Sequence, residues 1–433
     1  MFIQIHMLQS MPPGNLNRDD TGQPKKCIFG RVTRARISSQ CLKRNIRRYF
    51  KDVFGDDLAV RTQYLPRMVA DELRKIEPDI HEDDLDKIKA TLAKQFKAED
   101  GAAPEDTEED NEKQSETQAA TPPNGDTDRT KQLVFFPPPF AKGAAKLIAT
   151  LMQDKPAAYA EWVGAQAKKL TKEEKKKLTK EEGEKLKKEE KKLKDDIEKF
   201  EDDVTELSKS LTVDIGMFGR MTTSDLVVNV EAACQVAHAI STHEAIIESD
   251  YFTAMDDKKA EFASTQTERA GAAFMGTGDT RTFFDSAVYY KYLNLDVNAL
   301  KEHLSWKDDK AAHAAGVLLA AAARANPTGK QNSFAAHGIP ELILVEVCKA
   351  KSAISYANAF LKAVEGADLM AESAKALGGY VDAVANAFAP ADTRRVLLAV
   401  GPASVDIGGA ARVDTLDALV DSVAGLVKRG DAA

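Results

Sequence analysis

The sequence predicts an α+β fold that is divided by a large, charged helical insertion. Apolar side chains alternate at Ile3, Ile5 and Met7, and a period of two is typical of a strand. From Leu42 onward the apolar spacing changes to three and four residues, which is typical of a helix. The chain has 433 residues, of which 43% are apolar, so it exceeds what one hydrophobic core usually organises. We therefore expect two or three structural units and exclude wholesale disorder.

The N-terminal region is expected to form a strand, a loop and a helix in that order. The strand is expected over residues 2–8 and should not continue through residues 11–15, because two prolines there lack the backbone donor that a sheet needs. A polar loop, Asn17-Arg18-Asp19-Asp20, follows. Ser38 and Ser39 can then cap a helix. The apolar stripe of this helix is expected to consist of Leu42, Ile46, Tyr49, Val53 and the neighbouring Phe50.

The insertion is expected to contain three stretches of different character. Residues 58–96 have a helical period, with Leu85, Ile88, Leu92 and Phe96 on one face. Residues 99–130 hold eleven acids against two basic residues and are expected to be disordered. Residues 168–199 hold fourteen lysines and ten acids around a sparse apolar line. This pattern favours a long solvated helix or helical hairpin over a nucleic-acid contact, because the charges are mixed.

The rest of the chain is expected to complete the α+β unit. Residues 214–221 suggest a strand or a glycine-bent loop, and residues 230–243 suggest a helix. Residues 262–282 are rich in Ser, Thr, Gly and Ala, which is typical of a projecting hairpin. Strands are expected at 286–295 and 341–347, and a helix at 311–324. The C-terminal third is expected to be helical.

The charge of the chain is unevenly distributed. The net charge is −8, yet residues 24–51 contain ten Lys and Arg and no acid. A helix N-terminus beside Arg36 would expose backbone N–H groups that attract phosphate oxygens, and Lys43 and Arg47 could reach the next phosphates. Like charges one turn apart destabilise a helix, so stability does not explain this run. We therefore favour nucleic-acid binding over a solvated basic face.

Two possible metal sites have simpler interpretations. Asp19 and Asp20 could hold a divalent metal for phosphodiester cleavage, or they could order their own loop, which we favour because no convergent acids are evident. Cys234, His238 and His243 would share one helix, whose spacing does not suit tetrahedral zinc, so packed or capping histidines are favoured. No Walker, GxSxG or HExxH motif occurs, and the lone Gly276-Thr277-Gly278 is too weak to indicate a phosphate site. We expect neither a metal nor a cofactor.

The sequence favours a cytoplasmic protein. No apolar run approaches the roughly 20 residues of a membrane span, and the N-terminus lacks the pattern of a secretory leader. Four scattered cysteines, without a CxxC pair, do not form a disulfide framework. We expect a reducing compartment and no membrane partner.

A set of motifs spread over most of the chain resembles the CasC family, also called the Cas seven family, the backbone subunits of Cascade in type I-E CRISPR systems. The motifs occur in the family's order. They are Leu16-Asn17-Arg18-Asp19-Asp20, Ile28-Phe29-Gly30, Arg36-Ile37-Ser38-Ser39-Gln40 with Leu42-Lys43-Arg44, Val213-Asp214-Ile215, Gly219-Arg220-Met221, Ala237-His238-Ala239-Ile240-Ser241-Thr242-His243, Phe252-Thr253-Ala254-Met255-Asp256-Asp257, Tyr290-Lys291-Tyr292, Gly329-Lys330-Gln331 and Tyr356-Ala357-Asn358-Ala359-Phe360.

The resemblance implies an RRM-like (ferredoxin-like) palm with a large helical insertion and a protruding thumb hairpin. The palm would occupy residues 1–57, 211–251 and 286–433, the helical insertion 58–210, and the thumb 252–285. Copies of the chain would stack along a guide crRNA that pairs with target DNA, together with other Cascade subunits. The acidic tract and the Lys/Glu helix are larger than the family's helical region leads us to expect.

The resemblance also implies a set of RNA-binding residues and no catalysis. Met221 and the thumb would interrupt the stack of guide bases, so that short segments remain free for pairing. The alternative is a metal-dependent RNA endonuclease, as in relatives from type III complexes, with Asp19 or Asp20 at its centre. The expected RNA-binding residues are Asn17, Arg18, Arg36, Ser39, Gln40, Lys43, Arg44, Arg47, Arg220, Met221, Phe252, Lys330 and Gln331.

Overall fold

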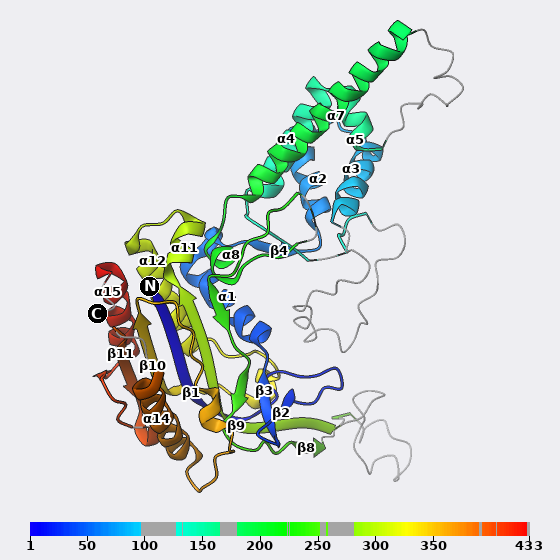
Figure 1. The fold of residues 1–433 in the computed structure, drawn as a ribbon. Helices are drawn as coiled ribbons and strands as arrows, with labels where there is room; N and C mark the ends of the chain where they lie inside the picture. Colours follow the sequence, from blue (N-terminus) through cyan, green and yellow to red (C-terminus); the bar gives the residue numbers. More distant parts are fainter. Residues whose placement is uncertain are drawn as a thin grey trace.

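A large, mostly antiparallel sheet with helices on both faces carries a separate helical bundle at one end (Figure 1). The computed structural model describes residues 1–96, 127–131, 133–164, 180–222, 224, 226–251, 257–258, 281–388, 392–403 and 405–430. Within these residues no helix is both long and apolar enough to cross a membrane. Most of the expected disordered tract at 99–130 and most of the expected thumb at 252–285 lie outside the described residues. At the described end of that tract the expectation of disorder was wrong, because Thr130 is buried and its backbone N–H donates to the carbonyl group of Gln63 at 2.8 Å.

The sheet is built around its N-terminal strand. β1 (Phe2–Gly14) lies between β10 (Pro340–Cys348) and β9 (Arg281–Asp296), antiparallel to both. The short strands β6 (Cys234–Val236) and β8 (Glu248–Tyr251) also pair with β9. Among the described strand pairs, β11–β12 alone is parallel. The order is β12 (Ala410–Val413), β11 (Arg394–Ala399), β10, β1, β9, β7 (Ala239–Ser241), β3 (Val32–Ile37) and β2 (Lys26–Phe29).

The alternation predicted for the first strand is confirmed. Ile3, Ile5 and Met7 face one core, while His6 and Leu8 face the other side of the sheet. The predicted end of this strand was wrong, because β1 continues through the two prolines to residue 14. Its pairing with β9 is irregular there, between Met11 and Gly14, which accommodates residues that cannot donate to the ladder.

Four of the described helices, each of eight residues or more, cover the face that carries Ile3, Ile5 and Met7. They are α1 (Ser39–Phe54), α11 (Val297–Leu304), α12 (Asp308–Arg324) and α15 (Leu416–Arg429). The other face is covered by α14 (Leu369–Phe388) and the turn η3 (Ala357–Phe360). The predicted helix at 311–324 and the predicted strands at 286–295 and 341–347 are confirmed. The C-terminal third contains β11 and β12 as well as the predicted helices.

A buried polar cluster lies beneath α14. Glu346 accepts hydrogen bonds from Arg395 Nε at 2.7 Å and from Tyr356 Oη at 2.8 Å, and His6 Nδ1 lies 2.9 Å from Tyr290 Oη. Burial alone would raise the pKa of Glu346, but the nearby His6, 3.5 Å away, and the hydrogen bonds from Arg395 and Tyr356 outweigh it and lower that pKa to about 2. Each buried polar atom with a partner avoids a desolvation cost of about 1–3 kcal/mol.

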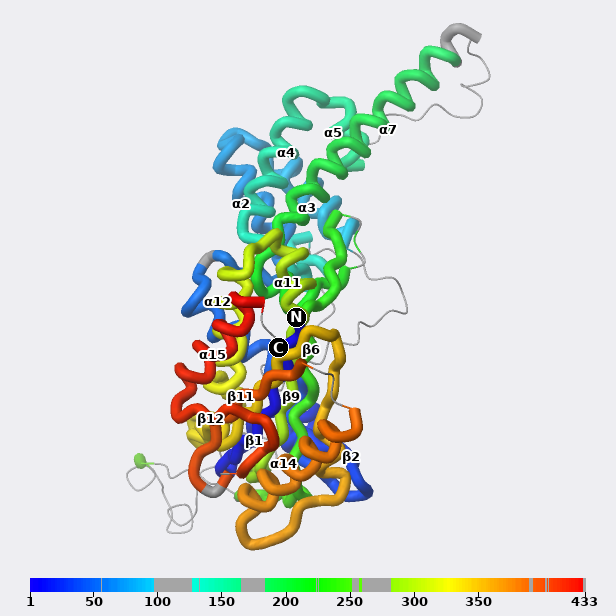
Figure 2. The backbone as a smooth tube through the Cα atoms, turned by 60° about the vertical axis from the view of Figure 1, so that its left-hand side comes forward, coloured from blue at the N-terminus to red at the C-terminus, as the bar shows by residue number. Residues whose placement is uncertain are grey.

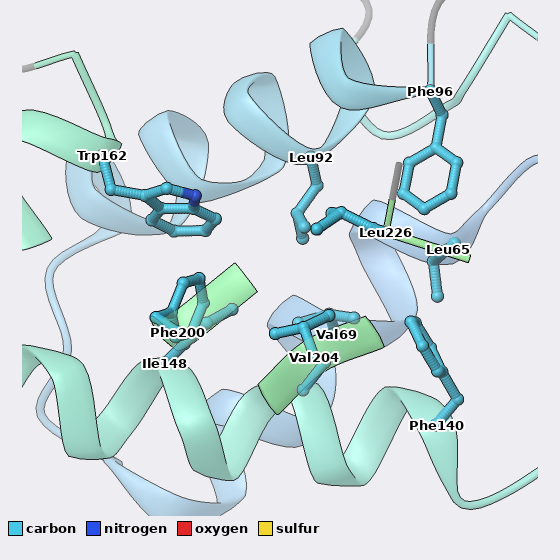
Figure 3. Close-up of a pocket in the computed structure, with 11 residues that line it drawn as sticks. Leu65, Val69, Leu92, Phe96, Phe140, Ile148, Trp162, Phe200, Val204 and Leu226 are labelled. Carbon is cyan, nitrogen blue, oxygen red and sulfur yellow. The ribbon is translucent and has the colours of Figure 1, made fainter. Parts of the chain in front are cut away.

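The helical bundle has its own apolar core. It contains α2 (Leu65–Ile76), α3 (Glu82–Gln95), α4 (Phe140–Asp154), α5 (Pro156–Trp162) and α7 (Lys180–Ser208). The side chains of Trp162, Phe200 and Val204 point into a small apolar cavity of about 10 Å³ between these helices (Figure 3). The N-terminal half of α7 extends past the other helices in both views of the chain (Figures 1 and 2). The predictions of helices in 58–96 and of a charged helix over residues 180–199 are confirmed; residues 165–179 are not described.

A small ribbon joins the bundle to the sheet. It consists of β4 (Val60–Thr62) and β5 (Val134–Phe136), which pair antiparallel. Between the bundle and β6 lies the short helix α8 (Val213–Phe218), where the sequence suggested a strand or loop. The remaining described turns are η1 (Gly55–Asp57), α13 (Gln331–Phe334) and η4 (Gly401–Ala403).

The helix predicted at 230–243 was wrong. This segment is extended and supplies β6 and β7 to the sheet. Cys234 and Val236 point into the core while Gln235 faces out, which is the period of two that the helical interpretation overlooked. The long strand β9 provides the backbone partners for both segments, and such tertiary pairing overrides local propensity.

Candidate nucleic-acid interface

The N-terminus of α1 is capped from within the chain. Ser38 Oγ accepts the backbone N–H of Cys41 at 3.2 Å, which confirms Ser38 as the cap. His238 Nδ1 accepts the backbone N–H of Ser39 at 3.0 Å. The backbone N–H groups of Ser39 and Cys41 are therefore already bonded, so the expectation of free donors for phosphate was wrong for these two groups. His238 therefore caps the helix, which is the role that the sequence favoured over a zinc ligand.

The loop before β2 is fastened to this cap. Asn17 Oδ1 accepts the backbone N–H of Ser38 at 2.8 Å. Asp19 Oδ1 accepts the N–H groups of Thr21 and Gln23 at 3.0 and 2.9 Å, and the hydroxyl of Thr21 at 2.8 Å. The carboxylate of Asp19 thus closes the turn of its own loop. Arg18, half-buried, has no carboxylate partner among the described residues.

A second turn packs against this loop. A Cβ on Gly329 would lie 2.5 Å from the carbonyl oxygen of Leu16, so only glycine permits this approach. The next residue, Lys330, has a φ of 52° and precedes α13. Gln331 Nε2 donates to the carbonyl groups of Pro327 and Ala336, at 2.9 and 3.0 Å, and holds the turn closed. Two motifs that are 313 residues apart in sequence, around Leu16 and Gly329, therefore meet beside α1.

The exposed side of α1 is basic. Gln40, Leu42, Ile46 and Phe50 are buried, whereas Tyr49 is only partly buried and Val53 is exposed, so the predicted stripe is shorter than expected. The basic side chains Lys43, Arg44, Arg48 and Lys51 are at least partly exposed. The first turn of the helix contains no acid. Arg36, at the end of β3, makes only a long contact of 3.4 Å with His238 Nδ1, and no carboxylate pairs with Arg36 or Lys43 in the described part of the chain.

Arg47 is turned inward, unlike its neighbours on α1. Its Nε donates to Asp214 Oδ2 at 3.0 Å and its Nη2 donates to the carbonyl group of Ala59 at 3.3 Å. Its guanidinium lies over the ring of Phe135, 4.5 Å from the ring centre. The phosphate contact expected for Arg47 therefore competes with three contacts inside the chain.

Arg220 is also turned inward, while Met221 projects into solvent. The Arg220 side chain is only 5% exposed and donates to the backbone carbonyl groups of Val228, Ser208 and Phe135. Burial lowers its pKa to about 10. Gly219, at a φ of 79°, makes the turn that precedes it. Met221 is 82% exposed, which is unusual for a methionine and leaves its side chain available to a partner.

The fold thus gathers most of the predicted residues into two places. The residues around the start of α1 are Asn17, Arg18, Arg36, Ser39, Gln40, Lys43 and Lys330. Arg44 lies on the exposed side of the helix, and Gln331 supports the turn of Lys330. Met221 follows Arg220, which donates to the carbonyl group of Phe135, the residue whose ring lies beneath Arg47. Phe252 lies outside the described residues. Strands β8 and β9 lead into the region predicted as the thumb.

Sequence reasoning missed Asp214 and Phe135, which organise the junction. Asp214 stands in a recognised motif, but a single buried acid gives no pattern that identifies its partner. Phe135 lies in a short apolar run between prolines and the acidic tract, where only the three-dimensional structure reveals the two arginines around it. In the described ranges, no group of three or more His, Cys, Asp or Glu side chains could hold a metal ion.

The whole chain is similar to solved structures of CRISPR surveillance complexes. A solved structure named "CRISPR RNA-guided surveillance complex, pre-nicking" matches 99% of this chain and 100% of its own, with 25% identity and a TM-score of 0.69. Another, named "CRISPR RNA-guided surveillance complex", shares the fold, covering 98% of this chain and 99% of its own at 23% identity and a TM-score of 0.62. No match was found among curated proteins.

The family comparison covers nearly the same length. The model of the CT1975-like protein family matches residues 3–422. This range includes the polar loop, α1, the turn at Lys330 and the segment that carries Met221, whose described residues 219–222 and 226–230 we call the Met221 arm. The chain therefore belongs to the CT1975-like protein family, in agreement with the Cas seven family recognised from its motifs.

Proposed function

We propose that this chain is the non-catalytic, multi-copy crRNA-binding backbone subunit of a type I-E Cascade-like CRISPR surveillance complex. It would hold the guide RNA for pairing with target DNA in antiviral defence, beside neighbouring copies and other Cascade subunits. Its family and the surveillance-complex structure that it matches along its full length support this proposal. We further propose that the protein acts in the cytoplasm.

The unpaired cations at the start of α1 carry the proposal. In the described part of the chain, Arg18, Arg36 and Lys43 have no carboxylate partner, although the chain has more acids than bases. Elsewhere on the surface, lysines pair with acids, as Lys155 does with Asp196 at 2.6 Å. Cations kept apart from acids retain their full attraction for phosphate, whose neutralisation releases counterions. We propose that these residues bind the phosphate backbone of the guide RNA, together with Asn17, Ser39, Gln40, Arg44 and Lys330.

The order of elements in the sheet supports an RRM-like palm. The β-α-β-β-α-β order of ferredoxin-like folds is followed along the chain. The successive elements are β1, α1, the segment of β6 and β7, β9, α12 and β10. β10, β1, β9 and β7 are neighbours in that spatial order, and α1 and α12 share one face. We propose the palm at 1–57, 211–251 and 286–433, the fingers at 58–210 and the thumb at 252–285, which would carry Phe252.

Met221 is proposed to interrupt the stack of guide bases. Its apolar side chain is exposed at the end of a rigidly bonded arm, where a flexible thioether can insert between bases. Insertion at regular intervals along stacked copies would leave short segments of guide free to pair with target. Here the protein holds the backbone and base pairing reads the sequence.

The endonuclease alternative depends on Asp19 and Asp20. The Oδ1 atom of Asp19 is already bonded to two backbone N–H groups and a hydroxyl, which favours the loop-ordering role. Incubation of the assembled protein with complementary RNA and magnesium tests this alternative. Regularly spaced cuts in the RNA that disappear in Asp19→Ala or Asp20→Ala would contradict a non-catalytic role. RNA that stays intact with the wild-type protein agrees with a non-catalytic role.

Purification of the chain with its bound nucleic acid tests the proposal directly. We expect extractable RNA that RNase, but not DNase, removes from the preparation. The double variant Arg36→Ala/Lys43→Ala should retain less RNA than the charge-matched control Lys375→Ala/Lys428→Ala. Equal RNA in both variants would contradict the assigned site, and a wild-type protein that neither retains nor binds RNA would contradict the function.

A further inference from the structure

Two arginines that the sequence places among the RNA contacts converge instead on one residue of the connecting ribbon. The carbonyl oxygen of Phe135 accepts a hydrogen bond from Arg220 Nη1 at 3.3 Å. The ring of the same residue lies beneath the guanidinium of Arg47, at 4.5 Å. Phe135 therefore lies between α1, which carries Arg47, and the Met221 arm, which contains Arg220.

The Arg220 side of this junction ties three segments together. Nη2 donates to the carbonyl oxygen of Ser208, the last residue of α7, at 2.9 Å. Nε and Nη2 both donate to the carbonyl oxygen of Val228, at 2.9 and 2.7 Å. The backbone of Arg220 exchanges two hydrogen bonds with Val230, at 2.9 and 2.8 Å. One planar guanidinium thus fixes the end of α7, β5 and both sides of the Met221 arm.

The Arg47 side ties α1 to the same place. Asp214, the partner of Arg47, is fully buried and also accepts the N–H group of Ala59 at 3.1 Å and the hydroxyl of Thr212 at 2.7 Å. Ala59 directly precedes β4, the strand that pairs with β5. The ribbon is therefore held by two charged side chains, Arg47 over the ring of Phe135 and Arg220 at its carbonyl oxygen, and both have their partners inside the chain.

We propose that Arg47 and Arg220 are positioning residues that clamp Phe135 and so set the distance between the cationic face of α1 and Met221. This inference rests on the proposed function, because the distance matters only if α1 grips phosphates while Met221 enters the base stack. Neither arginine need touch RNA. A lysine at position 220 keeps the charge but cannot bond three carbonyl groups in one plane, so the arm should loosen.

Arg34 provides a matched control. It is fully buried and donates to three backbone carbonyl groups, those of Phe29, Ser241 and Phe360, at 3.2, 3.0 and 2.7 Å. Its bonds join β2, β7 and η3, and none of them involves β5 or the Met221 arm. Arg34→Lys therefore also removes a buried guanidinium that bonds three carbonyl groups, but at a place far from Met221 in the bonding pattern. An effect seen in Arg220→Lys and not in Arg34→Lys is then due to lost positioning and not to general destabilisation.

The first experiment measures the geometry without RNA. Spin labels at Arg48→Cys on α1 and Met221→Cys on the arm, with Cys27→Ser to prevent labelling there, report the distance between the two sites. We expect Arg220→Lys to broaden the distance distribution roughly twofold, and Arg34→Lys to leave it unchanged. An unchanged distribution in Arg220→Lys, or equal broadening in both variants, would overturn the proposal. If Arg220→Lys does not fold, Phe135→Leu, which removes the ring and keeps the carbonyl group, replaces it.

The second experiment uses single-stranded RNAs that carry 2-aminopurine at successive positions. Wild-type protein should give fluorescence maxima at regular positions, where bases unstack. Arg220→Lys should flatten these maxima while the affinity for RNA changes by less than about threefold. Retained maxima would overturn the clamp. Absence of RNA binding by wild-type protein would instead contradict the proposed function, and the spin-label distances would still decide whether the clamp exists.

Discussion

Arg47 of α1 and Asp214 of α8 form a partly buried ion pair, with 3.0 Å between Nε and Oδ2. Arg47 is 21% exposed and Asp214 is fully buried, so the carboxylate depends on this cation and on its hydrogen bonds for compensation. The pair joins the basic helix α1 to α8, the short helix between the bundle and β6. It also removes one cation from the surface expected to meet RNA.

Removal of Asp214 should destabilise the chain strongly. Asp214→Ala leaves Arg47 without its partner and the N–H group of Ala59 without its acceptor, so we expect a loss of about 3 kcal/mol in the free energy of unfolding. Urea denaturation measures this loss. Asp20→Ala, at an exposed residue, is the control and should change stability by less than about 0.5 kcal/mol. A small effect at Asp214 would show that the pair does not support the junction.

Met221→Ala should separate binding from base disruption. Because the side chain is exposed, the free energy of unfolding should change by less than about 0.5 kcal/mol. RNA should still bind through the cations around α1, but the regular 2-aminopurine maxima should disappear. Ile246→Ala, at another exposed apolar residue, should keep them. Persistent maxima in Met221→Ala would assign the disruption to another part of the chain.

Glu346 should make the chain sensitive to acid. Its folded pKa of about 2 is below the ordinary value of 4.5, so its contribution is complete above pH 4.5 and is lost as the pH falls toward 2. Burial lowers the pKa of His6, whose protonation therefore also favours unfolding at acid pH. Melting temperatures between pH 6 and pH 3 should fall less steeply in Glu346→Gln than in wild type. Parallel curves would contradict a role for this carboxylate.

Gly329 should be needed for contact between the turn of Lys330 and the polar loop. A methyl group there would lie 2.5 Å from the carbonyl oxygen of Leu16, so Gly329→Ala should lower stability by roughly 1–3 kcal/mol and weaken RNA binding. Gly379→Ala, on the exposed side of α14 with nothing within 4 Å, should stabilise the chain by about 0.5–1 kcal/mol. Thermal denaturation distinguishes the two, and equal effects would contradict the steric argument.

The sequence predicted the parts of the fold that have a strong period. The alternation at Ile3, Ile5 and Met7 and the stripe at Leu85, Ile88 and Leu92 both predict the observed elements. The segment at 230–243 was misread, because its small residues fit either period and the long strand β9 decides its conformation. The end of β1 was misplaced, since an irregular pairing can absorb two prolines.

The sequence predicted which residues belong to the candidate site better than it predicted where their side chains point. The run of cations in 24–51 identified α1 and its surroundings, but charge alone does not show which side chains turn inward. Arg34, Arg47 and Arg220 are satisfied by backbone carbonyl groups or by Asp214, partners that lie up to 326 residues away in sequence. Such long-range contacts leave no local pattern, whereas the cap at Ser38 does, and it was predicted.

The dependence of RNA affinity on salt tests the central claim most directly. With a fluorescent single-stranded RNA, the logarithm of the association constant should fall linearly with the logarithm of salt concentration. Arg36→Ala/Lys43→Ala should reduce that slope by roughly 1.4, because each lost phosphate contact on a single strand accounts for about 0.7. The control Lys375→Ala/Lys428→Ala should keep the wild-type slope. An unchanged slope in Arg36→Ala/Lys43→Ala, or wild-type binding that salt does not weaken, would contradict the account.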